Sequence, residues 1–198
     1  PRHLIQSSRT LLARDLGSVL AFFVAPFVAR RVARSASSDV LPYYKSNHLA
    51  VIGDGDEMGW PAYCSYLDVE PELAFVTGPE AAGIAGYLIF NDVSARDVQL
   101  PEMFGTGPSR SKDFRDSKGL GPYLVTPDEV PDPLSLDVTV DVGGRFLWRG
   151  RTSEYARRPE QVLAYLSTIF PPRAGMVVGM GTIPDCTGLD NDQWLEPG

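Results

Sequence analysis

The chain has 198 residues, of which 43% are hydrophobic and 22% are charged, a composition typical of a globular protein with its own core. Its net charge of -7 and pI near 4.8 argue against a general nucleic-acid-binding protein, which needs a basic surface to meet phosphates. Its two cysteines, Cys64 and Cys186, belong to no metal or redox motif, so we expect a cytoplasmic protein without a disulfide framework.

The amino-terminal part differs in character from the rest and predicts two segments, a helical arm or lid over residues 1–37 and a β-rich domain over residues 38–198. Residues 1–36 carry six arginines and one acid, a pattern typical of a surface helix but also of a targeting leader. The apolar stretch over residues 16–29 is shorter than the roughly 20 residues that span a bilayer. We therefore expect a buried helix or packing arm there, and no membrane partner.

From Val40 onward, prolines and glycines recur at short spacing between apolar runs of strand length, which predicts a β-rich fold. The expected strands cover residues 50–52, 72–77, 86–90, 122–126, 136–142, 145–150 and 175–181. Gly143 and Gly144 predict a hairpin turn between two of these strands, because such a turn needs positive φ. Residues 157–170 place apolar side chains on one helical face and predict a helix.

The stretch DVEPELAFVTG, residues 68–78, places two glutamates where a strand is expected to begin. Glu70 and Glu72 project to the same face if the segment is extended, and Pro71 between them indicates a strand start or an edge. Two carboxylates on one face repel each other unless a cation lies between them. Asp92, at the end of the next expected strand, would complete an all-oxygen set that suits Mg²⁺, Mn²⁺ or Ca²⁺.

The spacing alone leaves two simpler interpretations open. Glu70 and Glu72 also fit a solvated strand face, since charged side chains usually face water. Asp92 is also placed where it would cap a helix that begins at Val93.

Segments over Val40 to Gly198 resemble, in the same order, those of the fumarylacetoacetate hydrolase family. The most specific is NDVSARDVQ, residues 91–99, and YLDVEPELAFVTG, residues 66–78, resembles the metal-binding strand of that family. The other matching segments are PYYKSN (42–47), SKDFRDSKGLGPYLVTPDEVPDP (111–133), GRTSEY (150–155) and GMGTIPDCTGLD (179–190).

The resemblance implies an α+β, β-rich fold, a mixed β-roll with barrel-like sheets and few helices, in which residues 38–198 are the catalytic domain of a homodimer. It also implies a divalent cation, commonly Mg²⁺, held by Glu70, Glu72 and Asp92. The implied activity is hydrolysis of a carbon–carbon bond in a β-diketone or acylpyruvate-type oxo acid. Some members of the family instead decarboxylate or isomerise related oxo acids.

Further site residues follow from the same resemblance. Lys112, Gln99 and Arg96 are the expected catalytic residues, and Lys45, Gly181 and Thr182 are expected to bind substrate. Each has a simpler alternative. Lys112 would be a solvated loop lysine, Arg96 a buried arginine paired with an acid, and the Gly181–Thr182 loop a tight turn; Lys45 would be a charge on a strand edge. Lys118 is a rival to Lys112 but lies closer to a turn.

The sequence departs from the family pattern at the general base. Many hydrolytic relatives have a histidine in an N-terminal lid segment, and no such segment is present; the two histidines are His3 and His48. Decarboxylation needs an electron sink and no activated water, so a decarboxylase or tautomerase remains an alternative, as does a non-catalytic subunit.

Overall fold

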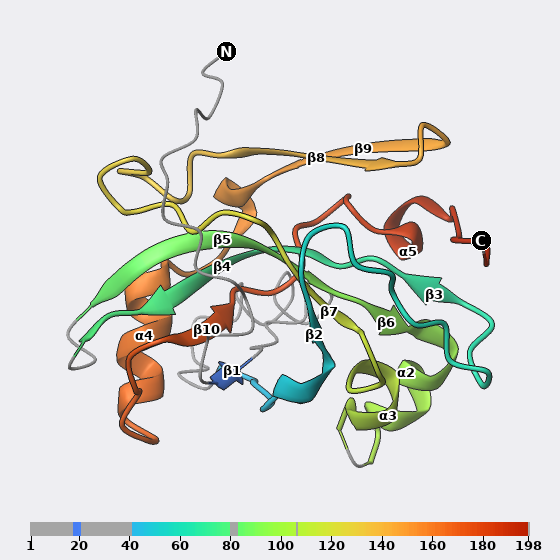
Figure 1. Ribbon diagram of the computed structural model, residues 1–198, viewed down its shortest axis with the longest axis horizontal. Coiled ribbons are helices and arrows are strands. Elements are labelled where there is room, and N and C mark those ends of the chain that lie inside the picture. Colours follow the sequence, from blue (N-terminus) through green and yellow to red (C-terminus); the bar gives the residue numbers. More distant parts are fainter. Residues whose placement is uncertain (1–17, 21–40, 80–82, 106, 198) are drawn as a thin grey trace.

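The computed structural model describes residues 18–20, 41–79, 83–105 and 107–197 (Figure 1). Its centre is a six-stranded sheet with the order β1-β10-β4-β5-β7-β2. Its strands are β1 (Ser18–Leu20), β2 (Val51–Ile52), β4 (Pro71–Thr77), β5 (Ile84–Asp92), β7 (Lys118–Leu120) and β10 (Met176–Gly179). The long strands β4 and β5 curve across the molecule. The two outermost pairs of the sheet, β1–β10 and β7–β2, are parallel, and the pairs between them are antiparallel. This mixed, curled sheet confirms the predicted α+β, β-rich class.

Two smaller sheets and a few short helices surround the central sheet. The remaining elements are β3 (Leu67–Asp68), β6 (Ser94–Ala95), β8 (Asp137–Val142), β9 (Phe146–Arg151), α2 (Arg96–Glu102), α3 (Ser109–Lys112), α4 (Pro159–Ser167), α5 (Gly188–Asn191) and the 3₁₀ turns η2 (His48–Ala50) and η4 (Thr152–Glu154). Strand β3 pairs with β6, and β8 pairs with β9. None of the helices in the described part of the chain is both long and apolar enough to cross a membrane.

The period-2 alternation of β4 gives the sheet two different faces. Leu73 and Phe75 point to the face covered by α4, where they join a core with Val162, Leu163 and Leu166. The intervening side chains point to the opposite face, where a second apolar cluster lies. This cluster consists of Ala74, Val76, Leu88, Phe90, Leu120 and Val177. By the same alternation, the glutamates that precede Ala74 share the face of the second cluster.

Most of the expected elements are confirmed, including the helix at α4 and the hairpin turn, where Gly143 and Gly144 have φ of 58° and 72°. The strand expected over residues 122–126 is wrong: the segment makes a single bridge, between Tyr87 and Val125. Pro122 has no N–H to donate, which limits ladder formation at this point.

The helix expected over residues 1–37 is wrong at Ser18–Leu20, which forms strand β1 on the edge of the sheet beside β10. Pairing with the free edge of β10 outweighs local helical preference at these residues. The other residues of this segment, and the proposed boundary between 37 and 38, lie outside the described residues.

Gly150→Ala is expected to lower the free energy of unfolding by about 1–3 kcal/mol, because a well-packed site resists an added methyl group. A Cβ at Gly150 would lie 2.6 Å from Cys186 Sγ, 2.7 Å from Ile183 Cγ2 and 2.8 Å from the Pro184 carbonyl oxygen. Gly83→Ala is the control, since its Cβ would meet no described atom within 4 Å. Urea denaturation of both variants measures the difference, and equal stabilities would contradict the prediction.

Candidate metal centre

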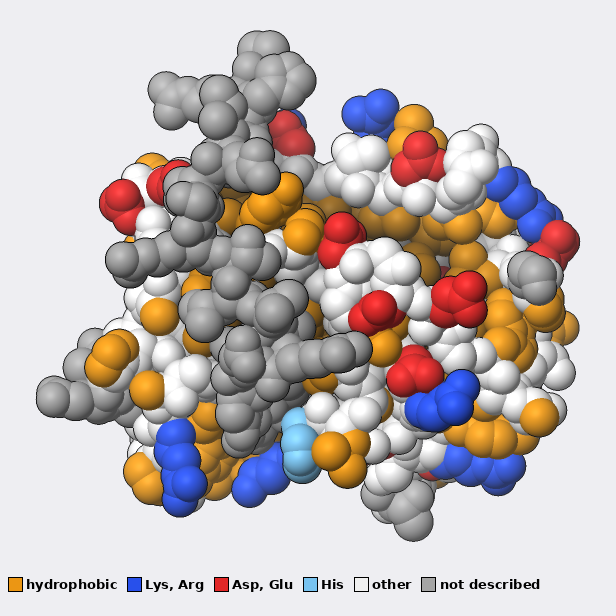
Figure 2. Space-filling view, viewed as in Figure 1, with side chains coloured by type: hydrophobic (Ala, Val, Ile, Leu, Met, Phe, Trp, Pro, Cys, Tyr) orange, Lys and Arg blue, Asp and Glu red, His pale blue; other side chains and the backbone are white. Residues whose placement is uncertain are grey.

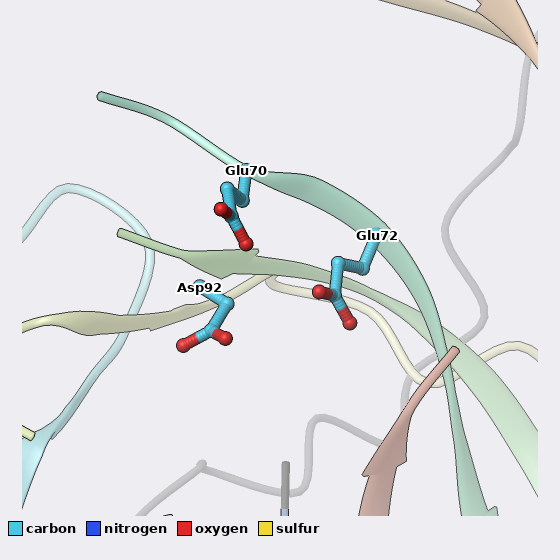
Figure 3. Close-up of side chains that lie close together, drawn as sticks. All are labelled: Glu70, Glu72 and Asp92. Carbon is cyan, nitrogen blue, oxygen red and sulfur yellow. The ribbon is translucent and has the colours of Figure 1, made fainter. Parts of the chain in front are cut away.

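The three predicted carboxylates converge at one end of the β4–β5 pair (Figure 3). Glu70 immediately precedes β4, Glu72 lies within it, and Asp92 is the last residue of β5. Pro71 of β4 pairs with Asn91 of β5, so Glu70 and Glu72 lie beside Asp92 at this end of the two strands. One oxygen from each carboxylate lies within 4.8 Å of the others, and the three residues are at most 2% exposed.

Both simpler interpretations of these carboxylates are therefore wrong. Glu70 and Glu72 do not line a solvated face, because their face is the one that packs the second apolar cluster. Asp92 does not cap a helix at Val93, because α2 begins at Arg96 and has no side-chain cap. Pro71 begins β4, as expected, although the strand is internal to the sheet.

Glu70 is held by three side chains. Its Oε1 accepts from Arg96, and its Oε2 accepts from Lys112 Nζ at 2.7 Å and from Thr182 Oγ1 at 2.9 Å. Burial alone would raise the pKa of Glu70, but the charges of Lys112 and Arg96 lower that pKa to about 2. Glu70 is therefore ionised at neutral pH.

Asp92 is also fully engaged. Its Oδ2 accepts from Lys112 Nζ at 2.9 Å and its Oδ1 from Lys118 Nζ, while the Tyr44 hydroxyl lies 3.1 and 3.2 Å from the two oxygens. Lys118 also donates to the Tyr44 hydroxyl at 3.0 Å. Both lysine side chains are completely buried, so Lys112 is not a solvated loop lysine.

Glu72 differs from the other two carboxylates. Its Oε2 accepts from the backbone N–H of Gly181 at 3.0 Å, but its Oε1 is a buried oxygen without a hydrogen-bond partner among the described residues. Burial raises the pKa of Glu72 well above its ordinary value, and the charges of Asp92 and Glu70 raise it further. A buried carboxylate of this kind is costly unless something neutralises it.

A second layer of contacts fixes the side chains behind Glu70. Arg96 pairs with Asp68 at 2.8 Å and donates to Gln99 Oε1 at 2.9 Å. Asp68 in turn accepts from the backbone N–H groups of Gly188 and Leu189 at the start of α5. These contacts match the interpretation of Arg96 as a buried arginine paired with acids, and catalytic roles for Arg96 and Gln99 remain predictions.

The structure does not gather all expected substrate residues at the carboxylates. Gly181 and Thr182 contact Glu72 and Glu70, and the Tyr155 hydroxyl donates to the Gly181 carbonyl at 2.8 Å. Lys45 is exposed, and its Nζ lies 5.2 Å from the centre of the Phe170 ring. Their roles in substrate binding remain predictions.

The sequence interpretation weighed Lys118 only as a rival to Lys112 and missed Tyr44, whereas the structure places both side chains at Asp92 together with Lys112. Lys118 is the first residue of β7, directly opposite Asp92 in the antiparallel pairing of β7 with β5. In the sequence, Lys118 begins a short run of residues that resembles a strand. The pairing of β7 with β5, which brings Lys118 to Asp92, depends on residues that are distant in the sequence. His48, one of the two histidines, is exposed in η2.

A family profile described as the C-terminal domain of fumarylacetoacetate (FAA) hydrolase matches residues 24–198. The chain belongs to the fumarylacetoacetate hydrolase family. The match begins within the predicted arm, upstream of the Val40 at which the sequence resemblance was placed.

The chain is also similar in sequence to curated proteins over more than half of its length. A protein from Burkholderia multivorans, whose name records a hydrolase of unproven activity, is 34% identical over 144 residues. A similarly named Burkholderia cenocepacia protein is 33% identical over 144 residues. Each alignment covers 68% of this chain and 50% of the relative, so the chain spans about half the length of the curated relatives it matches.

Solved structures similar to this fumarylacetoacetate hydrolase fold include enzymes of different activity. A 2-keto-3-deoxy-D-arabinonate dehydratase complexed with magnesium and 2,5-dioxopentanoate has a TM-score of 0.70 and 26% identity, covering 93% of this chain and 64% of that one. A 5-carboxymethyl-2-hydroxymuconate delta-isomerase from Mycobacterium smegmatis has a TM-score of 0.69 and 28% identity, covering 87% and 70%. Fumarylpyruvate hydrolase from Pseudomonas aeruginosa, solved with Mn²⁺ and pyruvate, shares the fold with a TM-score of 0.72 and 20% identity, covering 100% and 91%.

The carboxylates of this fumarylacetoacetate hydrolase relative fit a hard divalent cation. The three side chains supply oxygen ligands alone, which Mg²⁺ and Mn²⁺ prefer, and the unpartnered Glu72 Oε1 is a ligand atom that no described donor uses. Four buried carboxylates, those of Asp68, Glu70, Glu72 and Asp92, face three cationic side chains, those of Arg96, Lys112 and Lys118. These seven groups are therefore one positive charge short of neutral when all four carboxylates are ionised. Asp113, partly exposed and 4.0 Å from Lys118 Nζ, adds a further negative charge at the edge of the site.

Without metal, stability is expected to pass through a maximum in mild acid. The raised pKa of Glu72 contributes stability that is present below the ordinary value near 4.5 and lost as pH rises through the folded pKa. The lowered pKa of Glu70 contributes stability that is present above 4.5 and lost as pH falls towards about 2. Each group changes the free energy of unfolding by at most about 1.4 kcal/mol per pH unit within its window.

Urea denaturation of metal-stripped protein between pH 2 and 8, with and without saturating Mg²⁺, measures this profile. Saturating Mg²⁺ is expected to remove the loss of stability between mild acid and neutral pH, because it neutralises Glu72. A metal-free profile that rises steadily up to pH 8 would contradict the prediction.

Proposed function

We propose that this chain is a divalent-metal-dependent hydrolase that cleaves a carbon–carbon bond in a β-diketone or acylpyruvate-type oxo acid. The observation that carries the proposal is the buried convergence of Glu70, Glu72 and Asp92, with one Glu72 oxygen left without a partner. A dead site has no physical need for three buried carboxylates, since burying unneutralised charge costs stability.

We infer that Glu70, Glu72 and Asp92 hold Mg²⁺ or Mn²⁺, with Ca²⁺ a further candidate. When bound, the metal supplies Lewis-acid stabilisation for negative charge that develops on a substrate oxygen. The protein's own contribution is to hold the ligands in place. Lys112 bridges Glu70 Oε2 and Asp92 Oδ2. Thr182 also donates to Glu70 Oε2, and Arg96 donates to Glu70 Oε1.

The surroundings also determine which substrates fit. The ligands lie at the end of a dry apolar face, where electrostatic interactions are stronger than in water. We infer that Lys112 provides a positive charge beside the oxyanion that forms when the bond breaks, with Gln99 and Arg96 next to it. Gly181 and Thr182 contact Glu72 and Glu70, and we infer that they also bind the substrate carboxylate. Lys45, being exposed, would act at the acidic end of a longer substrate.

A second candidate is a decarboxylase or isomerase of a related oxo acid. Its support comes from the dehydratase and isomerase structures, which at 26% and 28% are more similar in sequence to this chain than the fumarylpyruvate hydrolase at 20%. These reactions need charge stabilisation at an enolate and no activated water.

The test begins with calorimetric titration of Mg²⁺ and Mn²⁺ into metal-stripped protein, alongside Glu70→Ala and Asp92→Ala variants checked for folding. Saturable binding that both variants lose is the expected result. Metal-loaded protein is then incubated with acylpyruvates and with 2-oxo acids that carry an isomerisable double bond. Appearance of pyruvate supports the hydrolase, and an isomerised or decarboxylated product supports the second candidate. A folded parent that binds neither metal would overturn the proposal.

We also propose that the protein works as a cytoplasmic homodimer. The thiols of Cys64 and Cys186 are buried and free, which suits a reducing compartment, and large apolar side chains such as Ile89 and Phe104 are exposed on the monomer. On the face drawn in Figure 2, acidic and basic side chains are interspersed, with no continuous basic patch among the described residues there. Analytical ultracentrifugation tests the dimer.

A further inference from the structure

Lys118 is a buried lysine paired with Asp92. Burial lowers the pKa of Lys118, and the charge of Asp92 opposes that effect. Lys118 begins β7 at the position paired with Asp92 of β5, so the sheet backbone holds the two residues opposite each other. The side chain is completely buried, and its Nζ donates to Asp92 Oδ1 and to the Tyr44 hydroxyl. A flexible surface lysine could move away from an incoming cation, but this one is enclosed.

Lys118 is not needed to complete the hydrogen bonds of Asp92. Lys112 Nζ already donates to Oδ2 at 2.9 Å, and the Tyr44 hydroxyl lies within 3.2 Å of both oxygens. What Lys118 adds is charge. With it, the four buried carboxylates face three cationic side chains, and without it they would face two.

The charge of Lys118 has opposite effects on two ligands. It repels a divalent cation bound to the same carboxylates, so it weakens metal binding. With a divalent ion bound, the four carboxylates, the three cationic side chains and the ion sum to +1, and they would sum to zero if Lys118 were absent. Asp113, a partly exposed carboxylate 4.0 Å from Lys118 Nζ, lowers both totals by one. In either case Lys118 makes the site more positive by one charge, which favours a substrate whose negative charge grows during the reaction.

We propose that Lys118 is a specificity-determining residue that weakens metal binding and strengthens the binding of dianionic, enolate-like ligands. The inference rests on the proposed metal-dependent function and deepens it: the preferred substrates are oxo acids whose reactive form carries two negative charges. A neutral diketone of the same shape gains less from Lys118.

The test compares Lys118→Met with the parent in two titrations. Mn²⁺ is titrated into metal-stripped protein, and oxalate, a planar dianion with the charge of a 2-oxo acid enolate, is titrated into Mn²⁺-saturated protein. Lys118→Met is expected to bind Mn²⁺ at least about tenfold more tightly and oxalate at least about tenfold more weakly, since unit charges at this range interact strongly in a buried site. Lys118→Gln, which keeps a hydrogen-bond donor without the charge, replaces it if the methionine variant does not fold.

Two controls separate the charge of Lys118 from general effects of charge. Arg149→Met removes an exposed positive charge from β9, and Glu129→Gln removes an exposed negative charge from the loop before β8. Both are expected to change the two affinities by less than about threefold, because charges exposed to solvent are screened. If Lys118 only stabilised the structure, its replacement would weaken the binding of both Mn²⁺ and oxalate. That result, or no change in either affinity, would overturn the inference. A parent that binds no Mn²⁺ would instead overturn the proposed function, and the inference with it.

Discussion

Lys112→Met is expected to lower the free energy of unfolding of the metal-free protein by about 3–5 kcal/mol, the usual cost of removing one partner from a buried ion pair. Lys112 Nζ lies 2.7 Å from Glu70 Oε2 and 2.9 Å from Asp92 Oδ2, and all three side chains are buried. Its removal leaves two carboxylates that repel each other with less positive charge between them. The methionine keeps the length of the side chain but not the charge.

Urea denaturation at pH 7 after removal of metal measures this loss. Lys45→Met is the matched control, since Lys45 is exposed and surface substitutions usually change stability by about 0.5 kcal/mol or less. Saturating Mg²⁺ is expected to restore part of the stability of Lys112→Met, because the metal supplies positive charge to the same carboxylates. A loss below about 1 kcal/mol would show that Lys112 does not carry the charge balance of the site.

Glu72→Gln is expected to weaken Mg²⁺ and Mn²⁺ binding by about 100-fold or more, because it removes a charged ligand and not merely a supporting contact. It is also expected to leave the metal-free protein at least as stable as the parent at pH 7. The reason is that Glu72 is buried with an unpartnered oxygen and a raised pKa, so its ionised form opposes folding. The amide has the same shape without that charge.

Calorimetric metal titration and urea denaturation of the same preparation measure the two effects. Glu129→Gln, at an exposed position in the loop before β8, is the control and is expected to change neither. If Glu72→Gln binds the metals with an affinity within threefold of the parent, Glu72 is not a metal ligand. A marked loss of metal-free stability would instead show that the Glu72 carboxylate is neutralised by a partner other than a metal.

Local sequence pattern predicted the features that depend on neighbouring residues. The shared face of Glu70 and Glu72 follows from strand alternation, and Pro71 correctly indicated where the strand begins. The hairpin at Gly143 and Gly144 and the helix that begins at Pro159 also depend on local chemistry. The burial of the two glutamates could not be predicted in this way, because residues two apart share a face whether that face is buried or exposed to solvent.

Features that depend on distant pairing could not be predicted from local pattern. The proximity of Asp92 to the glutamates came from the family resemblance and not from spacing. Lys118 reaches Asp92 only because β7 pairs with β5 in one register, across a connection that includes two helices. Strand β1 likewise forms beside β10, more than 150 residues away in the sequence.

The alternation of β4 has a consequence for how the gene can change. Glu70 and Glu72 share their face with Ala74 and Val76, so a single-residue insertion between Glu72 and Ala74 would turn the glutamates towards α4 or the apolar residues away from their cluster. Either outcome damages the fold and the site together. Length variation during evolution is therefore expected to be excluded from residues 70–76 and tolerated in the connection between β4 and β5.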